Sequence, residues 1–348
     1  MNAHELIESY SNLIDRRLGD YVQEVVRRAA GYHSFIASVY ETLGEFLLRK
    51  GKRIASCSTL LTYEGYNGSV DSEILDVCVA VEFYRHSILI HDDLVDGDKY
   101  RRGGLTIHTL YAEDHNQRFG EALALFCGNL LFSQALAVLW GTRFQRDSLF
   151  RASQLLTEDY LAVNESQILD LLFEYKTPTV EEWRVMASKR AASLFKATMG
   201  IGALLAGAPE RDIKKVREAA SHIGYAFDIQ DDLIGTFASE EQYGRPLGGD
   251  ILLGKKPLHI VYVYEMASKD ELKELEDALK ARSLDKGVIE IVRRVVKRCG
   301  ALERAERTLK EEALNGIKLL DDTSMLPEGK KRLREMVKFV TESFDWYK

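Results

Sequence analysis

The sequence predicts an all-α protein that forms a single domain over residues 1–348. Apolar residues recur at intervals of three and four, the spacing of one helix face, as at Leu43, Phe46 and Leu47. Only 5 of the 348 residues are proline, so long stretches can run helical without interruption. Alternating apolar and polar runs, which would indicate strands, are scarce, and neither a flexible linker nor an internal repeat divides the chain.

Several helix ends can be located from residue types alone. An apolar helix is predicted over 74–90, and an acidic segment follows it directly. Thr179 and Glu182 form a capping box, so a second long helix is predicted over 179–206. Two irregular stretches come after acidic helix ends and are expected to carry the chemistry: 97–106 and 237–256.

Composition excludes several classes of partner. The net charge of −7 provides no basic surface for nucleic acid or an anionic membrane. No apolar run approaches the ~18 residues of a membrane span and the N-terminus lacks signal-peptide features, so a cytoplasmic protein without stable membrane insertion is expected. The four cysteines lack CxxC spacing and are expected to be small core residues: Cys57, Cys78, Cys127 and Cys299.

Two groups of aspartates are spaced to share a helix face. Asp92 and Asp96 are four residues apart, with Asp93 about 100° around the helix. The second group follows i, i+3 and i+4 spacing: Asp228, Asp231 and Asp232. Grouped carboxylates repel one another unless a cation lies among them, and oxygen ligands favour magnesium. Two acidic faces could clamp one polyanion through several magnesium ions, although either group alone could be a solvated helix end.

Basic residues follow each acidic group: Arg101 and Arg102 after the first, and Arg245, Lys255 and Lys256 after the second. Arginine offers phosphate a planar fork of donors and lysine a compact charge. Acids that hold metal beside bases that hold phosphate imply a diphosphate substrate. A third basic stretch, 49–53, could hold a second, metal-free diphosphate or could simply be a solvated helix end.

With these motifs, the chain resembles the trans-type polyprenyl diphosphate synthases, the family of farnesyl and geranylgeranyl diphosphate synthases. The resemblance runs from about Gly44 to the C-terminus. Residues 91–108 resemble the first aspartate-rich motif with its arginine pair, and 230–237 resemble the second in its archaeal, short-chain form. Two further landmarks follow in the expected order: 165–170 and 244–255. The resemblance implies an all-α isoprenoid-synthase bundle around a deep central cavity, and a homodimer.

The resemblance also implies roles for the charged residues. Three magnesium ions, for which manganese can substitute, would grip an allylic diphosphate through five carboxylates: Asp92, Asp93, Asp96, Asp231 and Asp232. The leaving charge would be neutralised by three cations, Arg101, Arg245 and Lys255, and Arg190 would be a further catalytic residue. Isopentenyl diphosphate would be bound by Lys52, Arg53 and Arg102, and Gln167 would be a further substrate contact. Departure of diphosphate would leave an allylic carbocation, which the isopentenyl double bond attacks.

The chain departs from the family at positions that bind the isopentenyl diphosphate. Ala55 stands where an arginine is usual, and Ser56 replaces the usual proline. Arg85, seven residues before Asp92, takes the place of a histidine or glutamine. We hypothesise that Arg85 supplies the charge that is lost at Ala55.

Further departures lie near the second aspartate group. Arg190 and Ala191 replace a Lys-Thr pair, with Lys189 adjacent, so the charge is kept and the hydroxyl is lost. Asp228 replaces a common glutamine, and Gly235 replaces a third aspartate. Asp228 is therefore expected to lend a carboxylate to the second group and to contribute to substrate binding.

Product length should be set by the helix that carries Asp92. Ser87 and Ile88, five and four residues upstream, are not aromatic, so the pocket should stay open at that depth. Tyr84 and Phe83 lie one turn deeper, about 12 Å below Asp92 at helical rise. A C20 product, geranylgeranyl diphosphate, is predicted, with C25 as an alternative; the two aromatic residues could instead be plain core packing.

Three other functions fit parts of the pattern. A class I terpene cyclase would share the metal clamp and need no isopentenyl site, but Lys52, Arg53 and Arg102 argue against it. A non-catalytic subunit of a heteromeric synthase would tolerate the substituted phosphate ligands. A helical phosphohydrolase could use the His91-Asp92 pair, but it leaves the second aspartate group unexplained.

Overall fold

The computed structural model describes residues 3–239, 248–280 and 286–343, and within these ranges the chain is almost entirely helical, as predicted. The N-terminal half forms these helices: α1 (Ala3–Ala30), α2 (Ser34–Leu48), α3 (Ile54–Asn67), α4 (Ser72–Asp96), α5 (Ile107–Asp114), α6 (Gln117–Gly141) and α7 (Arg146–Tyr175). The C-terminal half forms the others: α8 (Val180–Ala187), α9 (Ala191–Leu205), α10 (Glu210–Phe237), α12 (Gly249–Leu253), α13 (Leu258–Met266), α14 (Lys269–Lys280), α15 (Lys286–Arg298), α16 (Ala301–Asp321) and α17 (Pro327–Glu342).

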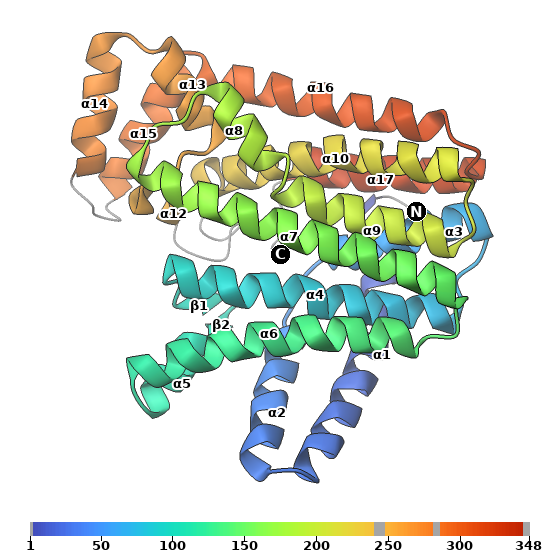
Figure 1. Cartoon of the computed structure of the whole chain (residues 1–348). Helices are drawn as coiled ribbons and strands as arrows, with labels where there is room; N and C mark the ends of the chain where they lie inside the picture. Colours follow the sequence, from blue (N-terminus) through green and yellow to red (C-terminus); the bar gives the residue numbers. More distant parts are fainter. Residues whose placement is uncertain (1–2, 240–247, 281–285, 344–348) are drawn as a thin grey trace.

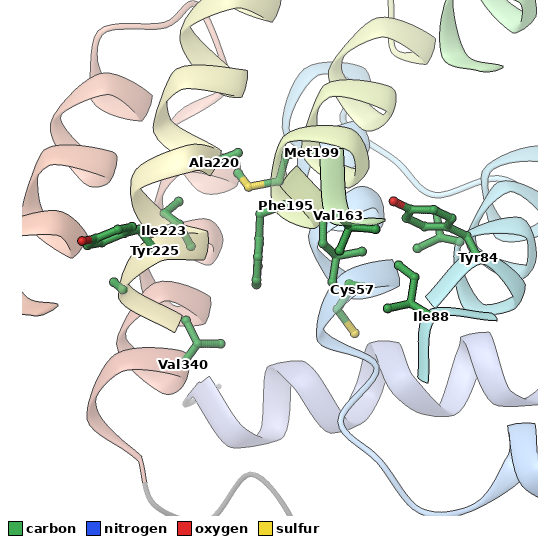
Figure 2. Close-up of a cluster of buried hydrophobic side chains, with 14 of the residues drawn as sticks. Cys57, Tyr84, Ile88, Val163, Phe195, Met199, Ala220, Ile223, Tyr225 and Val340 are labelled. Carbon is green, nitrogen blue, oxygen red and sulfur yellow. The ribbon is translucent and has the colours of Figure 1, made fainter. Parts of the chain in front are cut away.

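The long helices run side by side across the molecule (Figure 1). Helix α4 packs on α6, and on the other side of the bundle α9 packs between α7 and α10, with α16 next to α10. Helices α1 and α2 form a hairpin that projects from the bundle. One hydrophobic cluster includes buried residues from α1 through α17, and Figure 2 shows part of it, with Cys57, Phe195 and Met199.

Helix α4 begins and ends as its residue types dictate. The side chain of Asp71 accepts a hydrogen bond from the backbone N–H of Ile74 at 2.9 Å, which caps the first turn. Gly97 ends the helix with a φ of 67°, a left-handed conformation that glycine adopts without strain. The helix predicted over 74–90 is therefore confirmed, and it extends through Asp96, so the first aspartate group forms its last turn.

The prediction of one continuous helix over 179–206 is wrong. The capping box at Thr179 and Glu182 is present, but α8 ends at Ala187 and α9 begins at Ala191. At Arg190 the backbone ψ is −110°, far from helical, while its side chain reaches carboxylates of α10. The N–H groups of Lys189 and Arg190 bond to the carbonyls three residues earlier, and neither glycine nor proline marks the break in the sequence.

The two stretches predicted to be irregular contain short regular elements. A hairpin of β1 (Tyr100–Arg101) and β2 (Gly104–Leu105) lies in the first, and these are the strands of the described chain. The second contains α12, which is bounded by Gly248 and Gly254 with φ of 74° and 94°. Arg245 lies outside the described residues.

The cysteine prediction holds for three of the four residues. Cys57, Cys78 and Cys127 are buried, whereas Cys299 is half-buried, and all four are free thiols. Burial raises the pKa of the Cys57 and Cys127 thiols to about 12, so both stay protonated.

Helix α6 is the single helix of the described chain that is long and apolar enough to cross a membrane by length and composition. Core helices of soluble proteins pass the same test, and 39% of its most apolar window is buried against the rest of the bundle.

Candidate active site

The three residues of the first aspartate group lie in two environments: two line a cavity, and one is buried in an ion pair. Asp92 accepts a hydrogen bond from Gln167 of α7 at 2.7 Å, and Asp96 accepts one from Lys255 at 2.7 Å. Both aspartates line a cavity between α4, α7, α9 and α10, which we call the acidic cavity. Asp93 points elsewhere, is 1% exposed and is paired with Arg101. Its burial raises its pKa to about 7.

The second aspartate group meets the first across the acidic cavity. Its wall contains Asp228, Asp231 and Asp232 from α10, with Arg190 at the start of α9. The Nε of Arg190 donates to both carboxylate oxygens of Asp228, at 2.9 and 2.7 Å, and its Nη2 donates to Asp232 at 3.2 Å. Burial raises the pKa of Asp228 to about 6 even though Arg190 opposes the rise.

Asp170 joins the two groups, a role that its place in a family landmark did not predict. It is buried on α7, with Oδ1 3.6 Å from Arg190 Nη1 and Oδ2 3.3 Å from Lys255 Nζ. Burial works against the charge of Lys255, but Asp170, Asp250 and other carboxylates outweigh it and raise the Lys255 pKa. Arg190 and Lys255 therefore act as internal counterions among the carboxylates.

A second cavity, which we call the basic cavity, adjoins the first. It is lined by residues of 50–55, of α4 and of the hairpin, together with apolar side chains of α9 and α10: Lys50, Gly51, Lys52, Arg53, Ile54, Ala55, Glu82, Arg85, Leu89, Tyr100, Arg101, Arg102, Gly103, Leu194, Phe195 and Phe227. Arg85, Leu194 and Phe227 line both cavities. The nearest described partner of Lys52 Nζ is His4 Nε2, at 3.1 Å.

Two arginines of the basic cavity have strained backbones. Arg53 and Arg102 have φ of 47° and 51°, and they are the non-glycine residues with positive φ in the described chain. Such strain persists only where the surrounding structure enforces it, and it is concentrated at functional sites. Burial and the neighbouring Arg53 lower the pKa of Arg102 to about 10, and its Nη1 lies 3.3 Å from His86 Nε2.

The side chain of Arg53 is occupied by protein carboxylates. It is buried, 2.6 Å from Asp15 and 3.0 Å from Glu82. Ser56, at the position where the family has proline, donates a 2.5 Å hydrogen bond to the other oxygen of Glu82. Arg53 therefore lines the cavity as part of a buried ionic network.

Arg49 supports the hairpin instead of facing the basic cavity. Its Nη1 donates to the backbone carbonyls of Arg101 and Leu105, at 3.1 and 2.9 Å. A Cβ atom at Gly104 would lie 2.5 Å from the Cζ of Arg49, so any other residue there would force this guanidinium to move. Arg49 thus holds in place the turn that carries Arg101 and Arg102.

Two predicted site residues point away from both cavities. Lys189 forms an ion pair with Glu165 on the exposed surface, and Lys256 donates to the backbone carbonyls of Phe173 and Gly254. Lys189 was predicted as a site residue because it is adjacent to Arg190 in the sequence. In the turn between α8 and α9, the two side chains point in different directions.

The predicted chain-length residues lie at the wall of the acidic cavity and beneath it. Ile88 lines that cavity, and Tyr84, one turn deeper, is fully buried, with its ring 5.9 Å from Tyr160 and 6.3 Å from Phe132. Figure 2 shows Tyr84, Ile88 and Val163 together. Phe83 instead packs against Tyr21 of α1, at 5.7 Å, so it faces away from the cavity. Ser87 is buried and bonds back to the carbonyl of Tyr84.

The carboxylates suit a hard cation in chemistry but do not form a closed cage. Within the described ranges, no three His, Cys, Asp or Glu side chains are grouped as a metal site. Magnesium takes few protein ligands and completes its shell with water and phosphate oxygens. Pairs such as Asp92 with Asp96, and Asp231 with Asp232, therefore fit magnesium that arrives with a diphosphate.

An all-α bundle in which two acidic helix faces and a basic pocket meet over apolar walls defines a class of enzymes that act on diphosphates. Comparison with known proteins names the family: residues 37–296 match the family model described as "Polyprenyl synthetase". The chain therefore belongs to the polyprenyl synthetase family, and it is a transferase of the short-chain isoprenyl diphosphate synthase type, as the sequence motifs predicted.

Individual relatives agree with this assignment. The chain is 32% identical over 241 residues to a short chain isoprenyl diphosphate synthase of Methanocaldococcus jannaschii, covering 69% of this chain and 71% of that one. It is 28% identical to a geranylgeranyl diphosphate synthase of Sulfolobus acidocaldarius, over 80% and 81% of the two chains. The structure of geranylgeranyl pyrophosphate synthetase from Pyrococcus horikoshii superposes with a TM-score of 0.81 at 26% identity, covering 98% and 99%. A geranylgeranyl pyrophosphate synthase from Corynebacterium glutamicum, solved with isoprenyl diphosphate and magnesium, shares the fold with a TM-score of 0.89 at 23% identity, covering 98% and 99%.

Proposed function

We propose that this transferase condenses allylic diphosphates (dimethylallyl, geranyl and farnesyl) with isopentenyl diphosphate, head to tail and in trans geometry, to give geranylgeranyl diphosphate. The observation that carries the proposal is the wall shared by the acidic and basic cavities, formed by Arg85, Leu194 and Phe227. Two diphosphates bound in the two cavities would have their hydrocarbon parts meet at this wall. Residues 1–348 are proposed to act as one domain, which the continuous hydrophobic cluster supports.

The acidic cavity is proposed to hold the allylic diphosphate. Three magnesium ions, or manganese in their place, would be held there by four carboxylates: Asp92, Asp96, Asp231 and Asp232, with Asp93 holding Arg101 beside them. Bound magnesium neutralises phosphate charge and makes diphosphate a better leaving group. Arg190 and Lys255 already lie among these carboxylates and can turn to the phosphate oxygens once the metal arrives.

The basic cavity is proposed to hold isopentenyl diphosphate without metal. Lys52, Arg85 and Arg102 supply its positive charge, and Arg102 has no ion pair within the described part of the chain. Leu194 and Phe227 exclude water from the space between the cavities, which protects an allylic carbocation from hydrolysis. The geranylgeranyl length is proposed because Tyr84, buried about 12 Å from Asp92 along the helix, would close the pocket at that depth.

A homodimer is proposed from the exposed apolar side chains of α6 and α7, and a cytoplasmic location is proposed from the composition. They form a large unpaired set for a water-facing surface: Leu125, Phe126, Trp140, Phe150, Leu161, Ile168 and Leu172. Exposed apolar surface of this kind is typical of an interface between subunits. The area also accounts for the apolar character of α6 without a membrane.

A heteromeric synthase subunit is the alternative with a specific observation behind it. The chain is 28% identical over 325 residues to a protein of Geobacillus stearothermophilus named heptaprenyl diphosphate synthase component 2. Both aspartate groups are nevertheless present, which favours an active enzyme. The terpene cyclase alternative is disfavoured because the basic cavity, which a cyclase does not need, is intact.

The test is to incubate the purified chain with magnesium, isopentenyl diphosphate and one of three allylic primers, and to identify products by mass spectrometry. A linear C20 diphosphate is the expected result, and C25 would move the length limit. Hydrocarbon released without consumption of isopentenyl diphosphate would establish a cyclase. If the chain is inactive by itself and becomes active when a partner chain is added, it is a subunit of a heteromeric synthase.

A further inference from the structure

Helices α4 and α7 descend from the acidic cavity in matched register. At the cavity, Asp92 bonds to Gln167 at 2.7 Å. Four residues earlier on each helix, Ile88 and Val163 both line the cavity. Eight residues earlier, α4 presents Tyr84, and the corresponding position of α7 is Asp159, whose neighbour Tyr160 contacts the Tyr84 ring. The two helices therefore present acidic and polar side chains at the cavity, apolar side chains one turn below, and buried polar side chains one turn deeper, beneath the cavity lining.

The carboxylate at the base is buried and incompletely bonded. Asp159 is 2% exposed, and its cationic neighbours are Lys196 of α9 at 4.0 Å and Arg217 of α10 at 3.8 Å. Neither cation is within hydrogen-bonding distance, and Asp159 Oδ2 has no hydrogen-bond partner among the described residues. Burial without a hydrogen bond raises the pKa of Asp159 to about 6.

The hydroxyl of Tyr84 is a buried hydrogen-bond donor without an acceptor in the described part of the chain. The side chain is fully buried, and its oxygen also lacks a partner within the described ranges. In Figure 2 the Tyr84 ring extends from α4 toward Val163, which lies one turn above Asp159 on the same face of α7. Burial raises the pKa of Tyr84, and the Asp159 charge raises it further, so the hydroxyl stays protonated and is a donor.

We propose that Asp159 is a positioning residue that fixes Tyr84 as a polar floor of the hydrocarbon pocket and thereby limits product length. One buried water, or a small rotation of either side chain, would join the Tyr84 hydroxyl to the free carboxylate oxygen. A growing chain that displaced Tyr84 would bring hydrocarbon against the buried carboxylate of Asp159, which is costly because Lys196 and Arg217 neutralise it only from 4.0 and 3.8 Å. The inference rests on the proposed function, because it takes Tyr84 as the floor.

The test removes polarity while it keeps volume. Tyr84→Phe deletes only the hydroxyl, and Asp159→Asn deletes only the charge. Either change should raise the share of the product one isoprene unit longer by about tenfold, the value of one hydrogen bond, at unchanged KM for the allylic primer. The double variant should shift the share no further than either single variant, because both remove the same interaction. Glu158→Gln, which removes the neighbouring exposed charge, is the matched control and should leave the products unchanged.

Three outcomes separate this inference from the proposed function. If Tyr84→Ala lengthens the product but Tyr84→Phe and Asp159→Asn do not, ring bulk alone forms the floor and the role of Asp159 is rejected. If Tyr84→Ala has no effect either, the floor itself lies elsewhere. Should Asp159→Asn fail to fold because Lys196 and Arg217 lose their counterion, Tyr84→Phe decides the question, since it leaves that charge cluster intact.

Discussion

Arg190 donates from its Nε to both oxygens of Asp228, at 2.9 and 2.7 Å. These are two of the positions at which the sequence departs from the family pattern of lysine and glutamine. The structure shows that the two departures contact each other, so they form one matched replacement. Both oxygens of Asp228 are used in this contact, and the expectation that Asp228 supplies a carboxylate to the second group stays a prediction.

The matched pair predicts a compensating double variant. Asp228→Gln and Arg190→Lys should each lower kcat by about ten- to a hundredfold, because each breaks a charge-assisted contact that aims Arg190 at Asp232. The double variant Arg190→Lys/Asp228→Gln, which restores the family residues, should lose less than the product of the two single effects. Steady-state kinetics at saturating substrates measures this. Strictly multiplicative losses would contradict a matched pair, and a parallel magnesium titration shows whether Asp228 also affects the metal.

Arg85 should bind the isopentenyl diphosphate in place of the arginine lost at Ala55. The residue lines the basic cavity, so Arg85→Ala should raise the KM for isopentenyl diphosphate by about tenfold or more. The reciprocal variant Arg85→His/Ala55→Arg should return the KM toward the starting value. An unchanged KM in Arg85→Ala would exclude this role for Arg85.

Gly104 should be required for the hairpin that carries Arg101 and Arg102. In Gly104→Ala the new methyl group would lie 2.5 Å from Arg49 Cζ and displace that guanidinium from the hairpin carbonyls. We expect kcat/KM to fall by about tenfold with a small loss of thermal stability. Gly141→Ala is the control, because nothing lies within 4 Å of its added Cβ. Equal effects of the two changes would show that hairpin placement is not the cause.

His259 should make stability depend on pH. The side chain is buried, its Nε2 lies 3.0 Å from Thr236 Oγ1, and burial lowers its pKa to about 3. Between pH 6.5, the ordinary pKa of histidine, and pH 3, His259 is protonated in the unfolded chain and neutral in the folded chain. The free energy of unfolding therefore falls as the pH drops from about 6.5 toward 3. Urea unfolding at several pH values should show that the free energy of unfolding falls by about 1.4 kcal/mol per pH unit in this range. The His259→Asn variant should have a smaller slope. A slope that survives in the variant would assign it to other groups.

Removal of divalent metal should abolish activity without unfolding the protein. Arg190, Arg101 and Lys255 already pair with the aspartates, so the carboxylates have counterions before metal binds. EDTA should leave the melting temperature nearly unchanged, whereas magnesium together with inorganic diphosphate should raise it by mass action. A large drop in melting temperature on chelation would show that the metal is structural.

The sequence predicted the parts of the site that depend on local spacing. Asp92 and Asp96 face the same cavity, as four-residue spacing on one helix requires, whereas Asp93, which was predicted as a metal ligand with them, is buried and paired with Arg101. The basic stretch at 49–53 was predicted as a group, but its members divide: Lys52 lines the cavity, Arg49 supports the hairpin and Arg53 is held by Asp15 and Glu82. Spacing along the sequence predicts which side chains lie near one another. It does not predict which of them forms an ion pair with a carboxylate from a distant part of the chain.

The features that sequence reasoning missed depend on contacts between distant residues. The break between α8 and α9 is held by Arg190 and Asp228, which are 38 positions apart. The place of Asp170 between Arg190 and Lys255 likewise needs three separate helices and loops in position. Such long-range ion pairs leave no periodic signal in the sequence, so they could be found only in the folded structure.

The shared register of α4 and α7 restricts how the enzyme can evolve. The paired positions of the two helices form a ladder, with the Asp92–Gln167 hydrogen bond at one end and the Tyr84–Tyr160 ring contact near the other. An insertion of one residue in either helix would rotate everything beyond it by about 100° and separate the metal ligands from the pocket base. New product lengths should therefore arise by exchange of individual side chains along the ladder, while the number of residues between its ends stays fixed.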